Sequence, residues 1–131
     1  MRPILAAMLI TLGMAEAKAE TLSEYRWEAR PILVFAPSAD DPRLAEQLGR
    51  FERADAALRD RRNVVIVDTE PGSALRARFR PEGFTVILVG LDGGEKFRGG
   101  EVVPVETLND RIDRMPMRRR ELRQRGEVPA E

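Results

Sequence analysis

The chain has 131 residues, with 22 basic and 22 acidic side chains and neither cysteine nor histidine. This neutral balance is unlike that of a strongly basic nucleic-acid-binding protein. The lack of cysteine excludes disulfides, thiol chemistry and Cys-ligated zinc or iron–sulfur centres. The lack of histidine excludes a Ser-His-Asp relay and a His-ligated metal, which leaves carboxylates, hydroxyls, arginine and backbone as reactive groups.

Residues 1–19 have the pattern of a secretory signal peptide. Arg2 supplies a positive start, an apolar run of about 12 residues follows, and small residues precede a cleavage site predicted after Ala19, with Ala17 as the alternative. The apolar run is shorter than the roughly 20 residues that a membrane-spanning helix needs. The sequence therefore predicts a periplasmic or secreted protein with no membrane span in its mature form. We divide the chain into a signal peptide (1–19), one domain (20–122) and a polar tail (123–131).

The next segment, ETLSEYRWEAR, predicts a short helix that packs Trp27 onto the domain, because buried tryptophan hides a large apolar area. The alternative is that Trp27 stacks on a ligand. Residues 31–36 are apolar throughout and predict a central strand. Leu44, Leu48 and Phe51 then recur at helical spacing within a predicted helix of about 18 residues.

Residues 64–68 predict a second buried strand, parallel to the first because a helix connects the two. Residues 84–90 predict a third strand, and Asp92-Gly-Gly94 predicts a hairpin turn into an edge strand. A helix to Met115 and a basic extension complete the domain. This order predicts an α/β, thioredoxin-like fold, in which a parallel βαβ unit and an antiparallel hairpin form a central mixed four-stranded sheet flanked by helices.

The loop between the first strand and its helix is the first candidate site. Such loops often carry the chemistry of α/β proteins, and the second strand ends in another carboxylate. The candidate binding residues here are Ser38, Asp40, Asp41, Arg43 and Asp68. Asp41 before Pro42 is also typical of a helix start. The site could therefore bind a polar ligand, support acid–base hydrolysis, or be only a helix cap.

The second candidate site is the arginine cluster Arg118, Arg119 and Arg120. It could dock an acidic protein, a glycan, a phospholipid surface or a nucleic acid, although the neutral overall charge does not favour a nucleic acid. The alternative is a solvated helix face on which Glu121 pairs with Arg125 at four-residue spacing.

Three segments, RWEARPILVFAPSADDPRLAEQL, GFTVILVGLDGGEKFR and IDRMPMRRRE, carry a family resemblance. From roughly Leu22 to Leu122, the chain resembles the bacterial family catalogued as domain of unknown function 4174. It is also similar to a domain of vertebrate extracellular proteins of the sushi-repeat and coiled-coil-containing type. The resemblance implies a thioredoxin- or peroxiredoxin-like fold without an established activity.

Comparison with thioredoxins places Asp40, Asp41, Pro42 and Arg43 where those proteins carry C-G-P-C, so both sulfur positions are lost. The thioredoxin cis-proline would fall near Thr85, which we add to the candidate binding residues. Our leading hypothesis is an exported, non-catalytic thioredoxin-fold module without cofactor or metal. It would bind an envelope or extracellular protein or an anionic ligand.

Overall fold

The computed structural model describes residues 21–127, so the predicted signal peptide and its cleavage site lie outside the described residues. The described residues form one short 3-10 helix, five α-helices and four strands. Their bounds are η1 Ser23–Tyr25, β1 Arg30–Phe35, α2 Pro42–Arg53, α3 Asp55–Asp60, β2 Asn63–Asp68, α4 Ala74–Phe79, β3 Thr85–Val89, β4 Glu95–Gly99, α5 Val105–Asp113 and α6 Pro116–Gln124.

The four strands form one mixed sheet in the order β2-β1-β3-β4. Strand β1 pairs parallel with β2 and antiparallel with β3, and β3 pairs antiparallel with β4. The predicted α/β class, the central position of β1 and the edge position of β4 are confirmed. This order and these strand directions are compatible with a thioredoxin-like arrangement.

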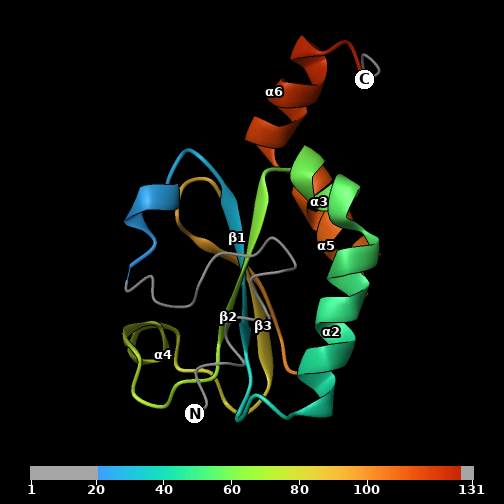
Figure 1. Cartoon of the computed structure of the whole chain (residues 1–131). Helices are drawn as coiled ribbons and strands as arrows, with labels where there is room; N and C mark the ends of the chain where they lie inside the picture. Colours follow the sequence, from blue (N-terminus) through green and yellow to red (C-terminus); the bar gives the residue numbers. More distant parts are fainter. Residues whose placement is uncertain (1–20, 128–131) are drawn as a thin grey trace.

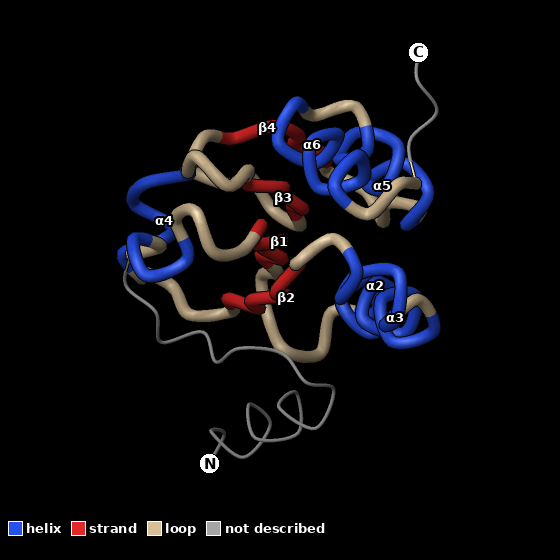
Figure 2. Tube along the Cα trace, turned by 90° about the horizontal axis from the view of Figure 1, so that it is seen from above, coloured by secondary structure: helices blue, strands red, loops and turns tan. Residues whose placement is uncertain are grey.

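Helices cover both faces of the sheet, which explains why β1 is buried throughout and apolar from Pro31 to Phe35 (Figure 2). Ile32 and Val34 project into the core beneath α2, α3 and α5, which also contains Leu44 and Leu108. The alternate β1 residues project into the opposite core, where α4 supplies Leu75 and Phe79. The alternation of side chains along each strand divides the apolar residues between the two layers.

The helix predicted from the loop to residue 60 is two helices. Helix α2 ends at Arg53, Ala54 leaves the helical conformation at φ −110° and ψ 24°, and α3 begins at Asp55. The apolar spacing does not show this break, because Leu58 of α3 reaches the same core as the residues of α2.

One further expectation is wrong. Trp27 is not packed onto the domain, since 56% of it is exposed. The basic extension is a separate helix, α6, which begins with Pro116 at its first turn and continues to Gln124. Figure 1 shows α6 at the opposite end of the sheet from the loop before α2, so the two candidate sites are far apart.

Candidate functional site

The loop before α2 is organised around Asp41, which caps the helix. Asp41 Oδ1 accepts hydrogen bonds from the backbone N–H of Arg43 at 2.9 Å and from its Nε at 3.0 Å, and Oδ2 pairs with Arg43 Nη2 at 2.7 Å. These bonds from Arg43 hold the pKa of Asp41 below its ordinary value. The Arg43 guanidinium also lies 5.1 Å from the centre of the Phe84 ring. The side chains of Asp41 and Arg43 are therefore paired with each other. The helix-cap interpretation accounts for the positions of both residues.

Ser38 and Asp40 are both exposed in this loop. The backbone carbonyl of Ser38 accepts the N–H of Asp41 at 3.2 Å, which closes the turn. Asp40 lies within this turn and is exposed. Ligand binding by these two residues stays a prediction.

Asp68 is buried at the end of β2 and its carboxylate is surrounded by donors. Oδ2 accepts the Ser73 hydroxyl at 2.6 Å, and Oδ1 accepts the backbone N–H of Glu70 at 2.9 Å. Arg76 contacts Oδ1 through Nε at 3.4 Å and donates from Nη2 to the Ala36 carbonyl at 2.8 Å. Arg76 thus joins the ends of β1 and β2, and Ser73 in turn caps α4 by accepting the N–H of Arg76. This arrangement holds the carboxyl end of the parallel pair together.

Thr85 is buried at the start of β3, and its hydroxyl donates to the Gly83 carbonyl at 3.2 Å. The peptide bonds of residues 21–127 are all trans, so this position has no cis-proline-like bend. Within the same residues, no group of three or more carboxylates is placed to hold a metal ion. No helix there is long and apolar enough to cross a membrane.

The arginine cluster is not a uniform solvated face, because Arg118 is buried. Only 2% of its side chain is exposed, and it pairs with Asp60 at 2.8 Å, Asp113 at 3.2 Å and Glu121 at 3.3 Å. Glu121 also pairs with the fully buried Arg30 of β1 at 3.1 Å. Glu121 therefore fastens α6 to β1, and Arg118 fastens α6 to the ends of α3 and α5.

Two more arginines complete this ion-pair cluster. Arg61 forms a fork to Asp113 at 2.8 and 3.0 Å, and Arg125 pairs with Asp60 at 2.8 Å. Arg125 thus binds α3 and Glu127 rather than the expected Glu121. The hydrogen bonds from Arg125 and then Arg118 hold the pKa of Asp60 well below its ordinary value. Burial acts to raise the pKa of Asp113, but the bonds from Arg61 and Arg118 outweigh it and lower the pKa.

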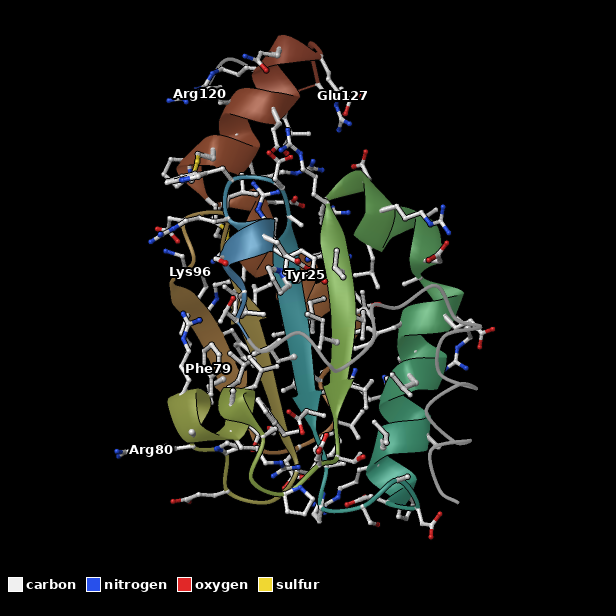
Figure 3. The ribbon with its side chains drawn as sticks, turned by 60° about the vertical axis from the view of Figure 1, so that its left-hand side comes forward. Tyr25, Phe79, Arg80, Lys96, Arg120 and Glu127 are labelled. Carbon is white, nitrogen blue, oxygen red and sulfur yellow. The ribbon has the colours of Figure 1, made fainter. Side chains whose placement is uncertain are left out.

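The structure separates the three predicted anion-binding arginines. Arg118 is enclosed by carboxylates, Arg119 is half-buried, and Arg120 is exposed on α6 (Figure 3). The Arg118 guanidinium is thus already neutralised by groups from three helices. An anion at the surface of α6 would therefore contact Arg120 but not Arg118.

Trp27 forms a different kind of surface near the start of β1. Among the described residues it is the exposed large hydrophobic side chain, and its φ is 67°, in the left-handed region that bulky residues avoid. Its backbone N–H donates to the Leu91 carbonyl at 2.7 Å. The preceding Arg26 donates from Nε to the Asp92 carbonyl at 3.3 Å, beside Gly93. The sequence indicated the aromatic residue but not its attachment to the β3–β4 turn.

A comparison with family models identifies the family of this chain. A model of the family described as "Domain of unknown function (DUF4174)" matches residues 21–121. The chain belongs to this family. The DUF4174 match includes Trp27, the loop before α2, the Asp68 group and the ion pairs of Arg118. The search of curated proteins found no match to the chain.

Proposed function

We propose that this DUF4174 protein is an exported, non-catalytic binding module of the thioredoxin-like type, and that Trp27 is its central contact residue. The observation that carries the proposal is the exposed tryptophan in a left-handed backbone conformation. The chain has no cysteine, and therefore it has no thiol group for redox chemistry.

The backbone of Trp27 supports a functional role because it is strained. A non-glycine residue in the left-handed region costs on the order of 1–3 kcal/mol, and such residues cluster at functional sites. Burial of the side chain does not compensate for this cost, since 56% of Trp27 is exposed. A glycine would adopt the same backbone without strain. A tryptophan at this position is therefore explained by what its indole contacts in a complex.

The surroundings of Trp27 are rigid enough to present it. The N–H of Trp27 is bonded to Leu91, and Arg26 and Arg78 donate to the carbonyls of the β3–β4 turn at 3.3 Å each. Fixing the turn in advance reduces the entropy lost on binding. Hydrogen bonds thus fix the backbone of Trp27, while its indole ring is exposed to solvent.

A protein is the partner class that fits this surface best. Tyr25, Arg26 and Trp27 are consecutive, and tyrosine, arginine and tryptophan are the residue types enriched at the energetic centres of protein interfaces. Tyr25 is half-buried and Arg26 is exposed, so the group combines an apolar centre with a polar margin. We therefore propose an envelope or extracellular protein as the ligand.

The carboxylates support a non-catalytic role. Asp41 is occupied by Arg43, and Asp68 by Ser73, Arg76 and a backbone N–H. A hydrolase needs an acid and a base that reach a substrate, and Asp40 is the loop carboxylate left in solvent. Asp40 alone does not provide the pair.

The test is capture of envelope proteins by the purified protein, with Trp27→Ala and Arg120→Ala examined in parallel. We expect a partner to bind the wild type and Arg120→Ala equally and to lose most of its affinity for Trp27→Ala. Trp27 is the chain's single tryptophan, so its fluorescence should shift to shorter wavelength when the isolated partner is added. Equal binding by Trp27→Ala, or an unshifted emission at saturation, would contradict the proposal.

Export is tested separately. We expect the chain recovered from the cell envelope to begin at Glu20, as determined by N-terminal mass spectrometry. Recovery of an uncleaved chain from the cytoplasm alone would contradict it.

A further inference from the structure

The two edges of the sheet are built differently. Edge strand β4 carries Glu95, Lys96 and Arg98, pairs Arg98 with Glu95 at 2.9 Å, and joins β3 with an irregular register at Leu88 and Val89. Charges and bulges of this kind prevent an edge from pairing with another strand. Strand β4 is therefore protected against pairing with a strand of another molecule.

Edge strand β2 has none of these devices over its centre. Its residues 64–67 are Val-Val-Ile-Val, with no charge, proline or glycine. Figure 2 shows β2 at the margin of the sheet, with the described helices lying on its two faces. The side chains of Val65, Ile66 and Val67 are buried by those helices. The groups of β2 that remain available to a partner at the margin of the sheet are therefore those of its backbone.

The pairing with β1 identifies which backbone groups of β2 point outward. The N–H of Arg30 donates to the carbonyl of Arg62, and the N–H of Ala36 donates to the carbonyl of Asp68. In a parallel ladder the bonding residues alternate, so the even-numbered residues of β2 bond to β1. The outward N–H and C=O groups consequently belong to Val65 and Val67, with Asn63 and Thr69 beside them.

The ends of β2 carry opposite charges. Arg62 precedes the strand and is exposed, with its nearest carboxylate, Glu121, at 3.7 Å. Glu70 follows the strand and is also exposed. An antiparallel copy would place the positive end of one strand beside the negative end of the other. A second copy of this chain, paired antiparallel, supplies such complementarity at both ends of β2.

We propose that β2 pairs antiparallel with β2 of a second copy of this chain across a two-fold axis at Ile66. This register is one in which outward groups face each other, Val65 opposite Val67 and Asn63 opposite Thr69, and it sets Arg62 opposite Glu70. The contact is isologous, as most homodimer contacts are. Because the side chains of β2 are already buried, the dimer is held by backbone hydrogen bonds and terminal charges, and it is a weak one.

The first test is backbone amide exchange in the purified protein at two concentrations, together with sedimentation equilibrium. We expect a dimer with a dissociation constant on the order of 10–100 μM, as for small interfaces. The amides of Val65 and Val67 should be protected only at the high concentration. Those of Val64 and Ile66 should be protected at both, since they bond to β1. A monomer at about 1 mM, or protection that appears instead on β4, overturns the proposal.

The second test exchanges the charges at the ends of β2. Glu70→Arg and Arg62→Glu each place like charges opposite each other and should weaken the dimer about tenfold, since the two-fold axis doubles each effect. The double variant restores opposite charges and should restore wild-type affinity. Circular dichroism checks that each variant is folded. A double variant no tighter than the singles overturns the register, and Val65→Pro, which removes an outward N–H but no bond to β1, should abolish the dimer.

Discussion

Replacing Arg118 by Met tests whether the ion-pair cluster holds α6 to the domain. Arg118 is 2% exposed and touches carboxylates from α3, α5 and α6. Methionine keeps much of the apolar stem but removes the charge and every hydrogen bond. Asp60, Asp113 and Glu121 would then lose their shared cation.

The structure sets the size of the effect. Removing one member of a buried ion pair costs about 3–5 kcal/mol, because the remaining charge is left unpaired. Here each carboxylate keeps at least one other arginine: Asp60 keeps Arg125, Asp113 keeps Arg61, and Glu121 keeps Arg30 and Arg62. The Asp60 side chain is also 41% exposed, so water compensates in part. We expect a loss of about 2 kcal/mol in the free energy of unfolding, or about 10 °C in Tm for a domain of this size.

Chemical denaturation at pH 7 measures this loss, with Arg120→Met as the matched control because Arg120 is exposed on the same helix. The control should change stability by less than about 0.5 kcal/mol. The pKa of Asp60 is lowered in the folded protein, so its contribution is present above the unfolded pKa of about 3.9 and is lost as the pH falls below it. The gap between wild type and Arg118→Met should therefore narrow between about pH 5 and pH 2. A loss under about 0.5 kcal/mol at pH 7, or a gap that widens in acid, would refute this reasoning.

Three further predictions concern single substitutions. Trp27→Gly relieves the left-handed strain, so the free energy of unfolding should stay the same or rise by about 1 kcal/mol in a urea titration; a clear loss would show that the indole is structural. Asp41→Ala removes the cap of α2 and should lower Tm, whereas Asp40→Ala should leave it unchanged; equal effects would contradict the cap assignment. Gln47→Leu leaves the N–H and C=O of Val103 without their buried partners, so calorimetry should show a loss of about 2 kcal/mol, and an unchanged transition would refute that role.

The local sequence pattern predicted a feature correctly where the interaction that stabilises this feature joins residues close together in the chain. The continuous apolar run of β1 indicated burial on both faces, and the structure places it in the centre of the sheet. Asp41 before Pro42 indicated a helix start, because a cap bonds within two residues of itself. The Asp92-Gly-Gly94 turn was predictable for the same reason: Asp92 bonds the N–H of Gly94.

Contacts between distant residues could not be predicted in this way. Arg30 and Glu121 are 91 positions apart, and Arg118 and Asp60 are 58 apart. A basic run in the sequence indicates charge but not which arginine the fold encloses. The prediction therefore grouped Arg118 with Arg120, although the first is buried and the second is in solvent.

The sequence by itself determined the strands, their order along the chain and the absence of thiol chemistry, since these depend on composition and on neighbouring residues. Tertiary structure decided which polar residues are enclosed and which apolar one is not. Trp27 shows the difference most clearly: its apolar area favours burial, yet its N–H is bonded to the Leu91 carbonyl, its φ is 67°, and 56% of the residue is exposed. That orientation depends on a turn more than sixty residues away, which no local pattern contains.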